Sequence, residues 1–162
     1  MVSDSGGFDD RSFNQLSFEG LQKASEDAGL EPITVQSNSP TDYTPNLNNL
    51  VDQGCGLIVT VGFALADATK QAAEQNPDVN FAIVDDNSIE LDNVKPLTYD
   101  MAQSAFLAGY AAASFSTTGV VGTFGGSQFP TVTIFMDGFA DGVQYFNEQK
   151  NRDCLLYTSP SP

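Results

Sequence analysis

The sequence contains no histidine and no tryptophan, and only six of its 162 residues are basic, against 21 that are acidic. Without histidine, catalytic triads that use imidazole as the base and zinc sites with histidine ligands are excluded. The net charge of −15 repels phosphate backbones and anionic lipid headgroups. The composition therefore points away from imidazole chemistry and from nucleic acid or a membrane surface as a direct partner.

Cysteines and long apolar runs are scarce as well. The two cysteines, Cys55 and Cys154, provide neither a metal cluster nor a disulfide framework. No apolar run approaches the roughly 20 residues that a helix needs to span a bilayer. The hydrophobic content of 41% is ordinary for a globular protein, and the length allows one compact domain or slightly more.

The last nine residues, CLLYTSPSP at 154–162, show no helical or strand period and end in a Ser-Pro-Ser-Pro breaker. They resemble the translation of a transposon-based sequencing adapter. We interpret them as a non-native tail, with a natural Ser/Pro-rich end as the alternative. Because Met1 falls inside a predicted strand, we also expect the chain to be a fragment of a longer protein.

Short apolar runs alternate with amphipathic ones over the first 98 residues. Strands are predicted at 1–3, 32–36, 56–60, 80–84 and, as a short crossing strand, 95–98; helices are predicted at 12–28, 43–53 and 64–75. Ser12 and Gln15 have the spacing of a capping box. The apolar face of the first helix is predicted at Phe13, Leu16, Leu21, Ala24 and Ala28. The alternation predicts an α/β fold, with a parallel sheet and helices on both faces.

The same pattern restarts in the second part of the chain. A helix is predicted at 100–115, a strand at 119–124 and a helix at 131–145. We therefore divide the chain into an N-terminal lobe at 1–99, the truncated start of a second lobe at 100–153, and the tail.

Polar residues follow the predicted strands at the edge where open parallel sheets bind ligands. Asp4 follows the first strand, Gly62 and Phe63 follow the third, and Asp85 follows the fourth. None of them is basic, and neither a GxGxxG nor a GxxxxGK[ST] motif occurs, so a phosphate ligand is disfavoured. Carboxylates suit neutral polyhydroxylic ligands, because one carboxylate accepts hydrogen bonds from two vicinal hydroxyls.

Several of these residues also have ordinary structural interpretations. Phe13 offers a stacking face, which with a sugar site would indicate a nucleoside, but an aromatic residue at a helix start is more often part of the core. Asp4 and Asp85 are equally typical of turns. We interpret Asp9 and Asp10 as solvated acids favoured by the helix dipole. Glycosidase or divalent-metal chemistry is disfavoured, because no second carboxylate cluster is present.

Four motifs, GGFDDRSFNQLSFEGLQKA, NFAIVDDN, AFLAGYAAA and GTFGGSQFPTVTIFMDGFADGV, resemble the basic membrane protein family. The similarity extends over residues 1–153. Members are substrate-binding lipoproteins of ABC importers, and their best-known type is a purine nucleoside receptor. The resemblance implies a type I periplasmic-binding-protein fold, in which two α/β lobes close on a ligand. It also implies an upstream signal peptide and lipidated cysteine, and therefore a lipid-anchored protein at the cell surface or in the periplasm.

The resemblance assigns the ligand site of this lobe to Asp4, Phe13, Asn14 and Asp85. In nucleoside-binding members, the first of these faces the base, the phenylalanine stacks on the purine, and the other two hold ribose hydroxyls. Gly62 and Phe63 are second-rank pocket residues.

We therefore expect the substrate-binding component of an ABC importer, which binds a nucleoside, preferably a purine nucleoside, between two lobes and passes it to a permease. Catalytic residues, metals, cofactors and nucleic acid have no part in this expectation, and membrane contact runs only through a lipid anchor absent from this chain. A ligand-sensing transcriptional activator with the same fold and a sugar receptor are the alternatives. An enzyme on a Rossmann-like sheet is disfavoured, because the phosphate motif, base and nucleophile are missing.

Overall fold

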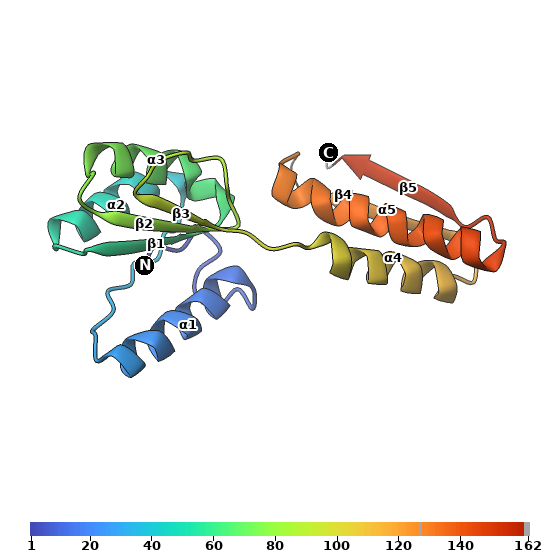
Figure 1. Ribbon diagram of the computed structural model, residues 1–162, viewed down its shortest axis with the longest axis horizontal. Coiled ribbons are helices and arrows are strands. Elements are labelled where there is room, and N and C mark those ends of the chain that lie inside the picture. The colour runs from blue at the N-terminus through green and yellow to red at the C-terminus, as the bar shows by residue number, and fades with distance from the viewer. Residues whose placement is uncertain (127, 161–162) are drawn as a thin grey trace. The chain divides into compact units, whose positions relative to one another are not determined.

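The computed structural model describes residues 1–126 and 128–160. The chain folds into two compact units, Met1–Thr98 and Tyr99–Pro162 (Figure 1), and each unit has a hydrophobic core of its own. Within the described ranges, no helix has both the length and the hydropathy that crossing a bilayer requires.

The first unit is built on a parallel sheet. Strands β1 (Leu57–Val61), β2 (Asn80–Val84) and β3 (Val94–Leu97) pair in that order, all parallel. The first two predicted strands are reduced to single parallel bridges, from Val2 to Val35 on one side and from Val2 to Thr60 on the other. The sheet therefore reverses its direction of growth between Val2 and β1, and such switch points are where open α/β sheets bind ligands.

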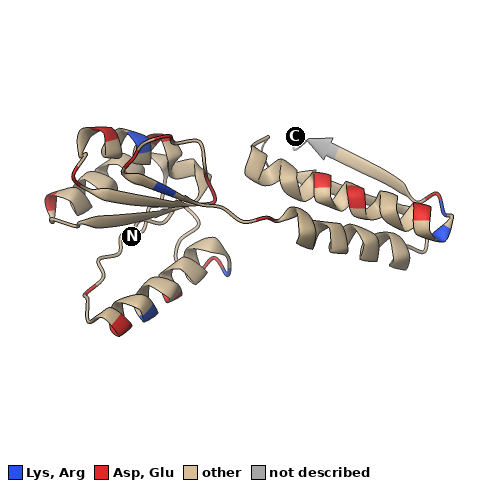
Figure 2. Ribbon diagram, viewed as in Figure 1, with Lys and Arg blue, Asp and Glu red and all other residues tan. Residues whose placement is uncertain are grey.

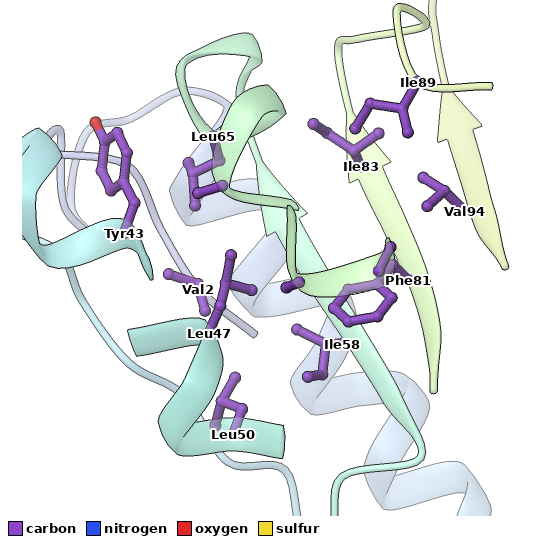
Figure 3. Packing of buried hydrophobic residues seen from close by; sticks show 13 residues of the cluster. Val2, Tyr43, Leu47, Leu50, Ile58, Leu65, Phe81, Ile83, Ile89 and Val94 are labelled. Atoms are coloured by element: carbon purple, nitrogen blue, oxygen red, sulfur yellow. The ribbon is translucent and has the colours of Figure 1, made fainter. Parts of the chain in front are cut away.

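Helices cover both faces of this sheet, as predicted. Helix α1 (Phe13–Ala28) lies on one face, and α2 (Tyr43–Asp52) and α3 (Ala66–Gln75) lie on the other (Figure 1). Two short 3₁₀ helices, η1 (Pro40–Asp42) and η2 (Phe63–Leu65), precede α2 and α3. The core under α2 and α3 includes the buried side chains of Leu47, Leu50, Ile58, Phe81 and Ile83 (Figure 3). Burying each of these stabilises the fold by about 1.5–3 kcal/mol.

The capping box predicted at the start of α1 is wrong. The Ser12 side chain makes no capping hydrogen bond. Instead, the Asp10 carboxylate accepts hydrogen bonds from the main-chain amides of Ser12, Gln15 and Asn14, at 2.8, 3.0 and 3.1 Å. A carboxylate has two charged oxygens and holds several amides at once, whereas one hydroxyl does not. Asp10, predicted to be a solvated acid, is therefore the cap of α1.

The predicted apolar face of α1 is only partly correct. Phe13 and Leu21 pack on the sheet beside Phe18, in a cluster with Met1, Val61 and Val84. However, Leu16 is 67% exposed and Ala24 and Ala28 are exposed, while the polar residues Asn14 and Ser25 are buried. The buried face of α1 thus includes the polar residue Asn14, whose burial is compensated by its hydrogen bonds. A search for apolar periodicity does not detect such a residue.

The second unit contains α4 (Ala102–Phe115), β4 (Val120–Gly125), α5 (Pro130–Lys150) and β5 (Leu155–Pro160), with β4 and β5 paired in parallel. Helices α4 and α5 pack closely because Gly109, Gly138 and Gly142 lie at their contact, where a Cβ would overlap the facing main chain. Strand β5 lies within residues 154–162, whose non-native origin stays a prediction. Residues 161 and 162 lie outside the described residues.

Candidate functional site

The carboxyl ends of the central strands lie side by side in the first unit. The Val61 amide donates to the Val2 carbonyl at 3.1 Å, and the Gly62 amide donates to the Val84 carbonyl at 3.0 Å. Asp4, Gly62 and Asp85 follow these strand ends directly, so the structure brings three predicted site residues to one edge. We call this set the carboxyl edge. Acidic side chains outnumber basic ones over the described chain (Figure 2).

Asp85 stands at this edge in an unusual state. Its φ of 64° is in the left-handed region, its side chain is only 9% exposed, and its amide donates to the Leu97 carbonyl at 2.8 Å. Among the described residues, none donates a hydrogen bond to its carboxylate. Burial raises the pKa of Asp85, and the negative charge of Asp86 raises it further. A carboxylate on a largely buried residue, kept without an internal donor and with oxygens that are not fully enclosed, is typical of a functional site.

Asp4 has one engaged oxygen and one open oxygen. Its Oδ1 accepts from the Gly6 amide at 2.8 Å and from Asn14 Nδ2 at 2.7 Å. Its Oδ2 lies against Gly62, where an added Cβ would stand 3.1 Å away. Gly62 also has a φ of 97°, a backbone conformation that residues other than glycine rarely adopt. Glycine is therefore required at 62 both for the turn and for the space beside Asp4.

Asn14 is almost completely enclosed. Its side chain is 3% exposed, and its Nδ2 donates to Asp4 Oδ1 at 2.7 Å and to Asp10 Oδ2 at 2.9 Å. The structure thus joins Asn14 to a second carboxylate, Asp10, which the sequence interpretation had placed in solvent. Burial alone would raise the pKa of Asp10, but the amides of Gln15, Ser12 and Asn14 and the Asn14 side chain outweigh it and hold that pKa below its ordinary value.

The two predicted aromatic residues flank the same edge. Phe13 is half-buried and packs on the cluster that contains Val61 and Val84, the last residues of β1 and β2. Phe63 is also half-buried and begins η2 directly after Gly62. Half-burial fits both interpretations of Phe13, as a core residue and as a stacking surface.

The side chains of the carboxyl edge offer hydrogen-bond acceptors. Asp4 and Asp85 supply carboxylate oxygens, and none of the six predicted site residues is basic. Within the described part of the chain, no group of three or more His, Cys, Asp or Glu is placed to hold a metal ion. The arrangement is suited to a ligand that offers hydroxyl or N–H donors. The sequence analysis missed the hydrogen bond between Asp10 and Asn14. The available signal was the spacing, because Asp10 lies four residues before Asn14.

The sequence is similar to known proteins over most of its length. The sequence model of the Bmp family, described as "ABC transporter substrate-binding protein PnrA-like", matches residues 1–151. The ABC transporter nucleoside-binding protein BmpA of Lactococcus lactis is 42% identical over 148 residues, which are 89% of this chain and 42% of that protein. Basic membrane protein A of Borreliella burgdorferi is 37% identical over 146 residues, which are 88% of this chain and 43% of that protein.

The fold agrees with solved structures as well. An ABC transporter solute-binding protein from Aeropyrum pernix superposes with a TM-score of 0.85 at 26% identity, over 98% of this chain and 46% of that one. This confirms the predicted type I periplasmic-binding-protein fold. The chain spans less than half the length of the curated relatives it matches. From the match over residues 1–151 and the identity to its relatives, the chain belongs to the Bmp family of PnrA-like ABC transporter substrate-binding proteins.

Proposed function

We propose that the carboxyl edge is part of the ligand site of an ABC-importer substrate-binding protein, and that the ligand is a nucleoside, preferably a purine nucleoside. The observation that carries this proposal is the carboxylate of the largely buried Asp85, which receives no hydrogen bond from the described residues and whose oxygens are not fully enclosed. A ribose presents two vicinal hydroxyls, and both donate to one carboxylate in bidentate fashion. Each such bond to a charged acceptor contributes about 1.5–3 kcal/mol.

The base would be held at the other end of the edge. Phe13 offers a ring for stacking, and a purine covers more of that ring than a pyrimidine does. The open Oδ2 of Asp4 would accept a hydrogen bond from an N–H of the base. The Lactococcus lactis relative is named a nucleoside-binding protein, which supports the same ligand class.

The charge of the edge favours a nucleoside over a nucleotide. A phosphate group would meet the carboxylates of Asp4 and Asp85 in a chain with a net charge of −15, with no basic residue among the predicted site residues to offset them. We expect a nucleoside monophosphate to bind at least about tenfold more weakly than the nucleoside, which corresponds to 1.4 kcal/mol.

The protein would bind its ligand and release it unchanged. The chain has no histidine to serve as a base, and the family consists of substrate-binding proteins. We therefore propose an ABC permease as the partner, and a lipid-anchored location at the cell surface or in the periplasm for the full-length protein.

Calorimetric titration of the full-length protein tests the proposal. The panel is a purine nucleoside, a pyrimidine nucleoside, ribose, the free purine base and the nucleoside monophosphate. We expect micromolar or tighter binding of the purine nucleoside, lost in Asp85→Ala and retained in Asp92→Ala, which removes the same charge from an exposed position. Binding of ribose but not of the nucleoside would change the ligand to a sugar. No binding across the panel would overturn the proposal.

A further inference from the structure

The side-chain amide of Asn14 has no free N–H group, and its carbonyl oxygen already accepts one hydrogen bond inside the protein. Its two N–H groups point to Asp4 Oδ1 and Asp10 Oδ2 at 2.7 and 2.9 Å, and its carbonyl oxygen accepts from the Asp4 amide at 3.3 Å. The residue is also 3% exposed. A ligand group that accepts from Asn14 would have to displace a bond to a charged partner, which is worth about 1.5–3 kcal/mol. The carbonyl oxygen keeps a second lone pair, but the enclosure of the side chain keeps a ligand hydroxyl from reaching it.

The same bonds fix Asp4 at two points. Asn14 holds both the main-chain amide of Asp4 and its Oδ1, and the Gly6 amide completes the coordination of that oxygen at 2.8 Å. Oδ2, by contrast, receives no hydrogen bond from the described residues and lies beside the bare Cα of Gly62. Because Asp4 is half-exposed, Oδ2 is the oxygen that remains for an external donor.

Asp10 determines which way the Asn14 amide points. Turning the amide by half a revolution would place its carbonyl oxygen against the carboxylates of Asp4 and Asp10, which both need a donor. The orientation with the NH₂ group between them is therefore strongly preferred. Asp10 itself is held by three main-chain amides at the start of α1, so this orientation is tied to the helix.

We propose that Asn14 is a positioning residue, clamped between Asp4 and Asp10, which aims Oδ2 of Asp4 at the ligand, and that it makes no contact with a ligand hydroxyl itself. The inference rests on the proposed function and differs from the ribose contact that the family resemblance assigns to Asn14. It predicts that Asn14 acts only through Asp4, so removing Asn14 matters only while Asp4 is present.

A double-mutant cycle in the full-length protein tests this inference. Affinities for a purine nucleoside and its 2′-deoxy and 3′-deoxy analogues are measured for wild type, Asn14→Ala, Asp4→Ala and the double variant. We expect Asn14→Ala to weaken all three ligands by the same factor, about tenfold, and to add less than about twofold in the Asp4→Ala background. Asp85→Asn, for which weakened but measurable binding is expected, is the positive control, and it should reduce the discrimination between the nucleoside and its deoxy analogues.

Two outcomes would go against these ideas in different ways, and a third would call for a second measurement. If Asn14→Ala removes discrimination against a deoxy analogue, or if its effect persists in the Asp4→Ala background, Asn14 is a direct ligand contact and the inference is wrong. If the wild-type protein binds no nucleoside, the proposed function fails, and this inference with it. If Asn14→Ala does not fold, proton exchange of the Asn14 side-chain amide in the wild type decides. Equal protection with and without nucleoside supports the clamp, and a change on binding contradicts it.

Discussion

Replacing Asp85 by asparagine should make the protein more stable and a weaker binder at the same time. Asparagine has nearly the same shape and tolerates the left-handed backbone that Asp85 adopts at φ 64°, so neither packing nor backbone strain changes. The substitution removes a charge that is 9% exposed and that no described residue neutralises. Because the oxygens of Asp85 are not fully enclosed, we expect a gain of at most about 1 kcal/mol, the lower end of the cost of burying a polar group without a partner. For a chain of this size that raises the Tm by at most about 2–4 °C.

The pH dependence of this gain has a definite sign. Burial and the nearby Asp86 raise the pKa of Asp85 above its ordinary value of 3.8, so the folded state takes up this proton more readily than the unfolded state does. The ionised group therefore lowers the stability of the fold above its folded-state pKa. That loss shrinks as the pH falls through the folded-state pKa and is gone below 3.8. The advantage of Asp85→Asn should be full at pH 7 and absent at pH 3.

Binding should change in the opposite direction. An amide offers one neutral acceptor where the carboxylate offers two charged ones, so the affinity for a nucleoside should fall by about 10–100-fold, or 1.5–3 kcal/mol. Differential scanning calorimetry and titration calorimetry measure the two effects, with the exposed Asp92→Asn as the charge-matched control. A lower Tm in Asp85→Asn would show that the carboxylate stabilises the fold. An unchanged affinity would remove Asp85 from the ligand site.

Three further substitutions test the helices. Asp10→Ala should lower the free energy of unfolding by about 1 kcal/mol at pH 7. The pKa of Asp10 is depressed in the folded state, so urea titrations should show the full cost above pH 3.8 and a smaller cost as the pH falls through the folded-state pKa. A cost that does not change with pH would contradict the role of Asp10 as the cap of α1. Gly142→Ala should cost about 1–3 kcal/mol, because its Cβ meets the main chain of α4. Gly20→Ala on α1, with open space around it, should gain about 0.5–1 kcal/mol. Thermal melts in which Gly142→Ala and Gly20→Ala change the Tm equally would contradict the close packing of α4 and α5.

The central sheet was predictable because its strands are buried on both faces. The runs LIVTV and NFAIV pack between helices and so read as unbroken apolar segments. The segments around Val2 and Val35 contribute only single bridges, and their boundaries were predicted too wide. Sequence pattern reports which residues prefer burial, whereas the length of a strand pair depends on hydrogen bonds to a neighbour distant in the chain.

The site was predictable in its location and less so in its detail. Parallel strands bring their carboxyl ends together, which places Asp4, Gly62 and Asp85 at one edge. The left-handed conformation of Asp85 and the engagement of a single oxygen of Asp4 follow from tertiary contacts. Asn14 is the clearest example, because the family resemblance assigns it to a ribose hydroxyl and nothing in the sequence indicates its two carboxylate partners.

The most direct test of the account is to map the binding site by NMR in the full-length ¹⁵N-labelled protein as a purine nucleoside is added. We predict that the largest chemical-shift changes occur at the amides of Gly62 and Asp85, on the carboxyl edge, and at the amide of Gly6, which donates to the Asp4 carboxylate. The opposite edge of the same sheet carries a cavity lined in part by Leu30, Cys55 and Leu57, which serves as the internal comparison. Changes centred on that cavity, or no changes at the carboxyl edge, would contradict the central claim.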